Sequence, residues 1–137
     1  MKLPTIEQFE AGEIDGRSFG HEAHLYLAWC YLQQEELLQA ISRYRAALQR
    51  LTRRLGAEAK YHETITWIYL VAIAERLEAR PDADWAGFRR ANPDLFEPVP
   101  RWLGGYYSPG RLASAQARRR FVLPDRAPGS RADTTAR

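Results

Sequence analysis

A chain of 137 residues, of which 45% are hydrophobic and 27% charged, has the size and composition of one globular domain. Its single cysteine, Cys30, excludes an internal disulfide and a zinc site built from several thiolates, and no run of about 18 uncharged residues indicates a membrane span. The acidic N-terminal stretch does not resemble a secretion signal, so the sequence predicts a cytoplasmic protein with no membrane partner.

The formal net charge is +3, and every basic residue except Lys2 and Lys60 is an arginine. GC-rich codons favour arginine over lysine, so this bias predicts a bacterial source and says little about function. Three arginines are consecutive at 118–120, but neighbouring residues on a helix point in different directions. A solvated helix end is therefore favoured over a nucleic-acid contact, and the oligomeric state is left open.

The first elements are predicted from helix-capping patterns. Thr5 and Gln8 have the spacing of a capping box, which indicates a short helix stopped by Gly12. After a turn at 15–17, Ser18 is in position to cap a second helix over 19–33.

Two longer helices follow. Leucines, isoleucine and tyrosine spaced at i, i+3, i+4 and i+7 predict a helix over 35–55 that is closed by Gly56. The segment 63–79 is apolar nearly all round, which is typical of a central helix. Its β-branched residues leave a strand as the alternative, but its length and its ending favour a helix.

In the C-terminal third, the predicted elements are short and are separated by breaks in the helical pattern. A small helix is predicted over 84–91, a second opens at Ser108–Pro109, and Ser114 is a cap for a last one through Arg120. From Pro124 onward the composition predicts a flexible tail. The fold class is therefore predicted as all-α, an irregular bundle of three longer helices with short C-terminal helices, in a single domain over 1–123.

The three histidines suggest a metal site. His21 and His24 lie three apart and share a helix face, and His62 is the only other histidine. Three neutral imidazoles suit a divalent ion such as Zn, Fe, Ni or Cu and leave a coordination position open for water or a small-molecule substrate. The leading hypothesis is a small metal-binding protein or metal-dependent enzyme with ligands His21, His24 and His62.

The segment Tyr61–Thr66 is the basis of the alternatives to a metal site. It is polar yet leads into the most apolar helix, and burying such groups is costly unless they are paired. Thr66 lies four residues after His62 and is expected to orient its imidazole at a cofactor site, or else Thr64 caps the helix and Thr66 is exposed. A metal-free enzyme would use His62 with Glu63 or Tyr61 as acid–base groups. In a non-enzymatic helical interaction module, the histidines would be incidental.

These segments also resemble a group of small bacterial helical proteins. The shared motifs are Phe-x-His-x-x-His-Leu-x-Leu-Ala-Trp-x-Tyr-Leu, Tyr-His-x-Thr-x-Thr and Asn-Pro-x-Leu followed by a hydrophobic residue. In this chain they read Phe19–Leu32, Tyr61–Thr66 and Asn92–Phe96, and a C-terminal match covers Tyr107–Asp125. The resemblance implies that the histidine segments and the region around Ser108 belong to one compact unit. It implies no particular reaction.

Overall fold

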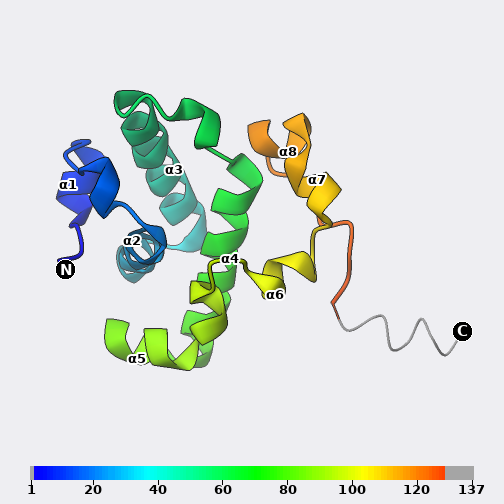
Figure 1. Ribbon diagram of the computed structural model, residues 1–137. Coiled ribbons are helices and arrows are strands. Elements are labelled where there is room, and N and C mark those ends of the chain that lie inside the picture. Colours follow the sequence, from blue (N-terminus) through cyan, green and yellow to red (C-terminus); the bar gives the residue numbers. More distant parts are fainter. Residues whose placement is uncertain (1, 129–137) are drawn as a thin grey trace, which may run out of the picture.

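A computed structural model describes residues 2–128 of the chain (Figure 1). Within that range the chain forms helices and no strand, which confirms the predicted all-α class. The helices are α1 (Ile6–Glu10), α2 (His21–Gln34), α3 (Leu37–Arg54), α4 (Glu63–Ala79), α5 (Trp85–Ala91), α6 (Arg101–Gly104), α7 (Pro109–Ala113) and α8 (Ala115–Arg119). Three short 3₁₀ turns are η1 (Gly16–Ser18), η2 (Glu58–Lys60) and η3 (Pro93–Phe96).

The predicted helices are present, but two of the predicted caps are wrong. Ser18 does not cap α2, because it lies inside η1, and the N-cap of α2 is Gly20. Thr64 does not cap α4, because the side chain of His62 takes that position and accepts the backbone N–H of Ile65. The capping box at the start of α1 is confirmed, as are the serine caps of α7 and α8. The turn predicted at 15–17 corresponds to η1, whereas η2, η3 and helix α6 were not predicted.

Helix α4 lies at the centre of the molecule, with α2 and α3 packed on one side and α8 on another (Figure 1). This position explains its apolar sequence, because a helix covered on several faces has little surface that needs polar residues. Over residues 2–128 no helix combines the length and hydropathy that a membrane crossing requires.

The buried residues form two hydrophobic clusters of unequal size. The larger joins α1 to α5 and η3 and includes Phe9, Tyr31 and Leu70 among its fully buried members. The smaller consists of Leu103, Tyr107, Ala117 and Val122, and it packs against the opposite side of α4. The C-terminal helices therefore rest on α4 through a core of their own.

Polar contacts hold the end of the described chain in place. The Ser108 hydroxyl donates to the Asp125 carboxylate over 2.6 Å, and the Arg126 backbone N–H donates to the Tyr106 carbonyl over 2.9 Å. These bonds lie inside the predicted tail, so the bonded structure extends beyond residue 123. The rest of the predicted tail, residues 129–137, lies outside the described residues.

Candidate functional site

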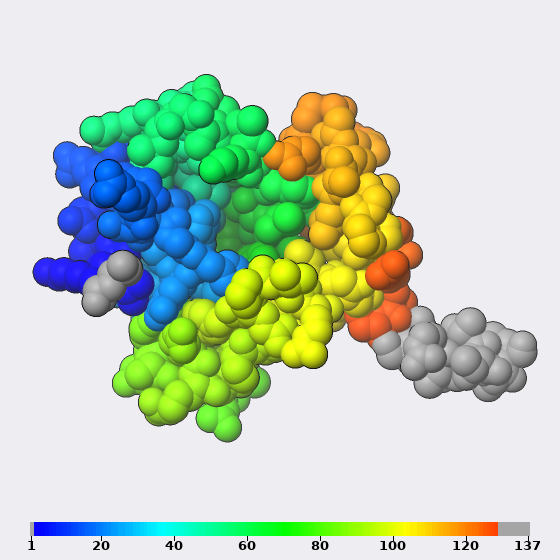
Figure 2. All heavy atoms as spheres, viewed as in Figure 1, coloured from blue at the N-terminus to red at the C-terminus, as the bar shows by residue number. Residues whose placement is uncertain are grey.

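A cavity of about 900 Å³ opens between the N-terminal helices and α6. In Figure 2 the molecule is hollowed between the blue segment on one side and the yellow and orange segments on the other, with green residues behind. Helices α2, α3, α4 and α6 all contribute to its wall, which is mostly apolar. All three histidines border it, as do the polar side chains of Tyr44, Tyr61, Thr66 and Tyr69.

His62 borders the cavity, but the fold occupies both of its ring nitrogens. Its Nδ1 accepts the N–H of Ile65, and its Nε2–H donates to the Leu112 carbonyl in α7 over 2.7 Å. Burial lowers the pKa of this imidazole below its ordinary value, which agrees with a neutral ring held between one donor and one acceptor. Exchange of a proton with a ligand would require one of these bonds to break.

His21 and His24 lie on one face of α2, as predicted. The Nε2–H of His21 donates to the Leu95 carbonyl over 3.0 Å, and its ring meets that of Tyr69 edge to face. The ring of His24 packs against Phe19 in a tilted arrangement with centroids 3.9 Å apart, and its Nδ1 lies 3.3 Å from the Tyr44 hydroxyl. No group within residues 2–128 bonds to the other nitrogen of His24, Nε2.

The surroundings of His24 keep it neutral. Burial, with a smaller contribution from the nearby His21, lowers its pKa from 6.5 to about 4. At neutral pH its free nitrogen is therefore an uncharged hydrogen-bonding group at the cavity.

The three histidines do not form the predicted metal centre. In the described part of the chain, no three histidine, cysteine or carboxylate side chains are grouped closely enough to hold a metal ion. The physical reason is clearest at His62, whose nitrogens are committed to α4 and α7. Binding of a divalent metal stays a prediction, for which the described side chains offer no ready ligand set.

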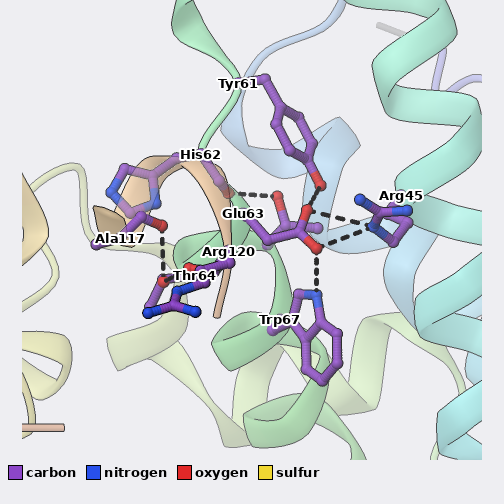
Figure 3. A network of polar contacts seen from close by, with 9 residues as sticks. Arg45, Tyr61, His62, Glu63, Thr64, Trp67, Ala117 and Arg120 are labelled. Atoms are coloured by element: carbon purple, nitrogen blue, oxygen red, sulfur yellow. Dashed lines mark hydrogen bonds and ion pairs between the residues drawn. The ribbon is translucent and has the colours of Figure 1, made fainter. Parts of the chain in front are cut away.

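Glu63 is the centre of a buried polar network (Figure 3). Its carboxylate accepts from the Tyr61 hydroxyl over 2.5 Å, from Arg45 Nε over 3.0 Å and from Trp67 Nε1 over 2.9 Å. Burial and the bond to Glu63 raise the pKa of Tyr61 above its usual range, so its phenol keeps its proton. Figure 3 shows the imidazole of His62 pointing away from this carboxylate. The predicted acid–base partners His62 and Glu63 therefore face different surroundings.

The two threonines of this segment have roles that differ from those predicted. Thr66 does not orient the imidazole of His62. Its hydroxyl donates instead to the His62 backbone carbonyl over 2.8 Å, although the side chain does border the cavity. Thr64 is fully buried, and its hydroxyl lies 2.7 Å from the Ala117 carbonyl and accepts the N–H of Val122 over 3.1 Å. Thr64 thus attaches the C-terminal segment to α4.

Sequence reasoning missed two features at the cavity border. The first is the start of α2, where Gly20 provides no side-chain cap and a Cβ added at this residue would meet nothing within 4 Å. The second is a pair of cations, Arg17 and Lys60, on the loops that flank the opening. Neither feature has a signal in the sequence, because the segments that border the cavity are far apart along the chain.

No family model, curated protein or solved structure matches this chain.

Proposed function

We propose that this protein binds a small organic molecule in the cavity between α2, α3, α4 and α6. The observation that supports the proposal most directly is the cavity's volume of about 900 Å³. Protein interiors are close-packed, with few voids larger than a water molecule, whereas ligand sites typically measure about 300–1,000 Å³. An opening of this size in a 137-residue chain indicates a ligand site rather than a packing defect.

The wall indicates a ligand with a mainly apolar body and at least one polar group. Apolar side chains such as Leu25, Leu48 and Ile65 provide most of the surface. The free Nε2 of His24 is a hydrogen-bonding group within that apolar surface, and a ligand hydroxyl, carbonyl or carboxylate would satisfy it.

Two other hypotheses fit the geometry less well. Acid–base chemistry centred on His62 conflicts with the two hydrogen bonds that occupy its nitrogens. An interaction module would dock through exposed apolar side chains, and the large ones within residues 2–128 are few and belong to different segments of the chain. They are Leu38, Leu55, Val99, Tyr106 and Leu123.

Titration with N-phenylnaphthylamine, an uncharged dye that becomes fluorescent in apolar surroundings, tests the proposal. We expect saturable binding of one dye per chain. Gly20→Trp should abolish this binding, because an indole at residue 20 projects into open space at the cavity border.

The matched control is Gly110→Trp, at a glycine outside the cavity whose Cβ position is also open. This variant should bind the dye like the wild type. The proposal fails if wild-type protein does not bind the dye, or if both tryptophan variants bind it with unchanged affinity while remaining folded by circular dichroism.

A further inference from the structure

The N-terminus of α2 leaves backbone donors unused at the cavity. The N–H groups of His21, Glu22 and Ala23 have no acceptor among the described residues, and the N-cap Gly20 provides no side chain to accept them. Gly20 and His21 border the cavity. The free donors and the positive end of the helix dipole favour an anion at this position.

The formal charges at the cavity border favour an anion as well. Arg17 and Lys60 have no ion pair with any described carboxylate, whereas Arg45, Arg76, Arg89 and Arg101 each pair with one and Arg43 pairs with two. The only carboxylate among the lining residues is that of Asp15, which accepts the backbone N–H of Arg17. Two cations and one anion leave a net charge of +1 at the border of an apolar cavity.

His24 provides a third, independent observation. Its unpartnered Nε2 lies in the first turn of α2, one residue after the last of these free N–H groups. The Tyr44 hydroxyl has two acceptors at 3.3 Å, Nδ1 and the His24 backbone carbonyl. In the tautomer in which it donates to Nδ1, Nε2 carries the proton of the neutral ring and can donate to a ligand at the cavity.

From these observations we infer that the ligand is an amphipathic organic acid. Its carboxylate binds at the N-terminus of α2, beside Arg17 and Lys60, and its apolar body lies along the wall formed by α3, α4 and α6. This inference rests on the proposed function, because it specifies the chemistry of the molecule that fills the same cavity.

Displacement of bound N-phenylnaphthylamine by decanoate and by decanol tests the charge requirement directly. The two competitors share a ten-carbon chain and differ in the charged group. We expect decanoate to bind at least fivefold more tightly than decanol at low ionic strength. This preference should shrink as salt is added, because exposed charges are screened within about 10 Å at 0.1 M salt.

Variants locate the charge. Replacing Arg17 and Lys60 together by glutamine should reduce decanoate affinity about fivefold and leave decanol affinity unchanged. The matched control replaces Arg119 and Arg120, which are exposed and lie outside the cavity, by glutamine. It removes the same net charge and should change neither affinity.

A second pair of variants tests the helix terminus. Gly20→Asp and Gly20→Asn both supply a cap for α2, and the backbone of Gly20 is extended, with φ −87° and ψ −171°, so either residue fits. Only the aspartate places a negative charge where the ligand carboxylate would bind. Gly20→Asp should therefore bind decanoate about tenfold more weakly than Gly20→Asn does. The two variants should bind decanol with similar affinity.

The outcomes separate the inference from the proposed function. If decanol displaces the dye as well as decanoate does, or if neither competitor displaces it, the acid inference is wrong and the cavity remains a binding site for other molecules. If the dye itself does not bind, the proposed function fails and the inference fails with it.

Discussion

His62 joins two parts of the backbone through one imidazole. It caps α4 through Nδ1 and holds the Leu112 carbonyl of α7 through Nε2. Loss of an N-cap costs about 1 kcal/mol, and a buried carbonyl left unpaired costs about 1–3 kcal/mol. His62→Ala should therefore lower the free energy of unfolding by about 2–4 kcal/mol, measured by urea denaturation.

His62→Asn provides the comparison for that variant. Asparagine is a good N-cap, but its shorter side chain does not reach the Leu112 carbonyl. It should recover about 1 kcal/mol of the loss. Equal stabilities for the alanine and asparagine variants would contradict the capping role.

His24 makes stability depend on pH. Its pKa in the fold, about 4, lies below the ordinary value of 6.5, so the folded state favours the neutral ring. The neutral imidazole contributes fully to the free energy of unfolding above pH 6.5, and this contribution is lost as the pH falls toward about 4. The difference between the two pKa values corresponds to about 3 kcal/mol. His24→Phe keeps a ring that packs against Phe19 and removes the titration. Between pH 7 and pH 4, the free energy of unfolding should fall by about 3 kcal/mol less in the variant than in the wild type, measured by urea denaturation at each pH.

A similar loss in both proteins would show that His24 does not titrate with a depressed pKa. The carboxylates that also protonate in this range are common to both proteins, so their effect cancels in the comparison.

At the residue scale, the sequence indicated that certain polar side chains need bonding partners, but it did not predict which partners they have. Polar residues at the start of an apolar helix indicated that Tyr61, His62 and Glu63 are paired, because unpaired burial is costly. The partners of His62 and Glu63 include Leu112, which lies 50 residues from His62 in sequence, and Arg45, which lies 18 from Glu63. No local pattern encodes such long-range partners, so His62 was assigned to metal or proton chemistry instead.

At the scale of elements, the buried face of α4 attaches the C-terminal helices through Thr64. Thr64→Val keeps the shape of the side chain and removes the hydroxyl that serves Ala117 and Val122. It leaves buried backbone groups unpaired, so we expect a loss of about 2–3 kcal/mol, measured by chemical denaturation. The Val122 amide should also exchange its hydrogen faster.

Thr66→Val is the matched control, two residues along the same helix. The Thr66 hydroxyl donates one turn back to the His62 carbonyl, which also accepts the backbone N–H of Thr66, and its other side-chain contact is with the Tyr61 hydroxyl at the cavity border. This substitution should cost less than about 1 kcal/mol. Equal losses in the two variants would argue against the anchoring role of Thr64.

Element positions followed from sequence where a local signal defined them. Helix α4 occupies the predicted range 63–79, since its apolar run and its ending are both local features. Helix α2 begins at His21 and not at the predicted residue 19, because Asp15 caps η1 and that turn continues through Ser18. Competition between two adjacent caps is decided by tertiary packing, which one sequence does not reveal.

At the scale of the whole molecule, the two hydrophobic clusters predict unequal stability. The smaller cluster has only four buried members, Leu103, Tyr107, Ala117 and Val122. Local opening is easiest where few apolar contacts resist it. Amides of α7 and α8 should therefore exchange hydrogen through openings of lower free energy than those of α2 to α4, measured by native-state hydrogen exchange.

Tyr107→Phe should widen this difference, because it removes the hydroxyl that donates to the Val122 carbonyl over 2.7 Å. Protection in α2 and α3 should change less than protection in α7 and α8. Uniform exchange across the molecule would show that the two clusters unfold as one unit.

The cavity itself was beyond sequence reasoning. Its wall combines residues from 15–28, 44–57, 60–70 and 100–103, and its volume depends on how these segments fail to fill the space between them. Periodicity predicts which face of a helix is buried, but not whether another side chain or a ligand covers it.

The contact between Tyr69 and Trp102 has a practical consequence. Tyr69 borders the cavity, and its ring meets the indole of Trp102 edge to face with centroids 5.1 Å apart. Coupled aromatic chromophores of this kind contribute to near-ultraviolet circular dichroism, and a guest that shifts the phenol ring alters their coupling. The molecule thus contains its own optical reporter of occupancy, which can follow uptake of colourless compounds without an attached label.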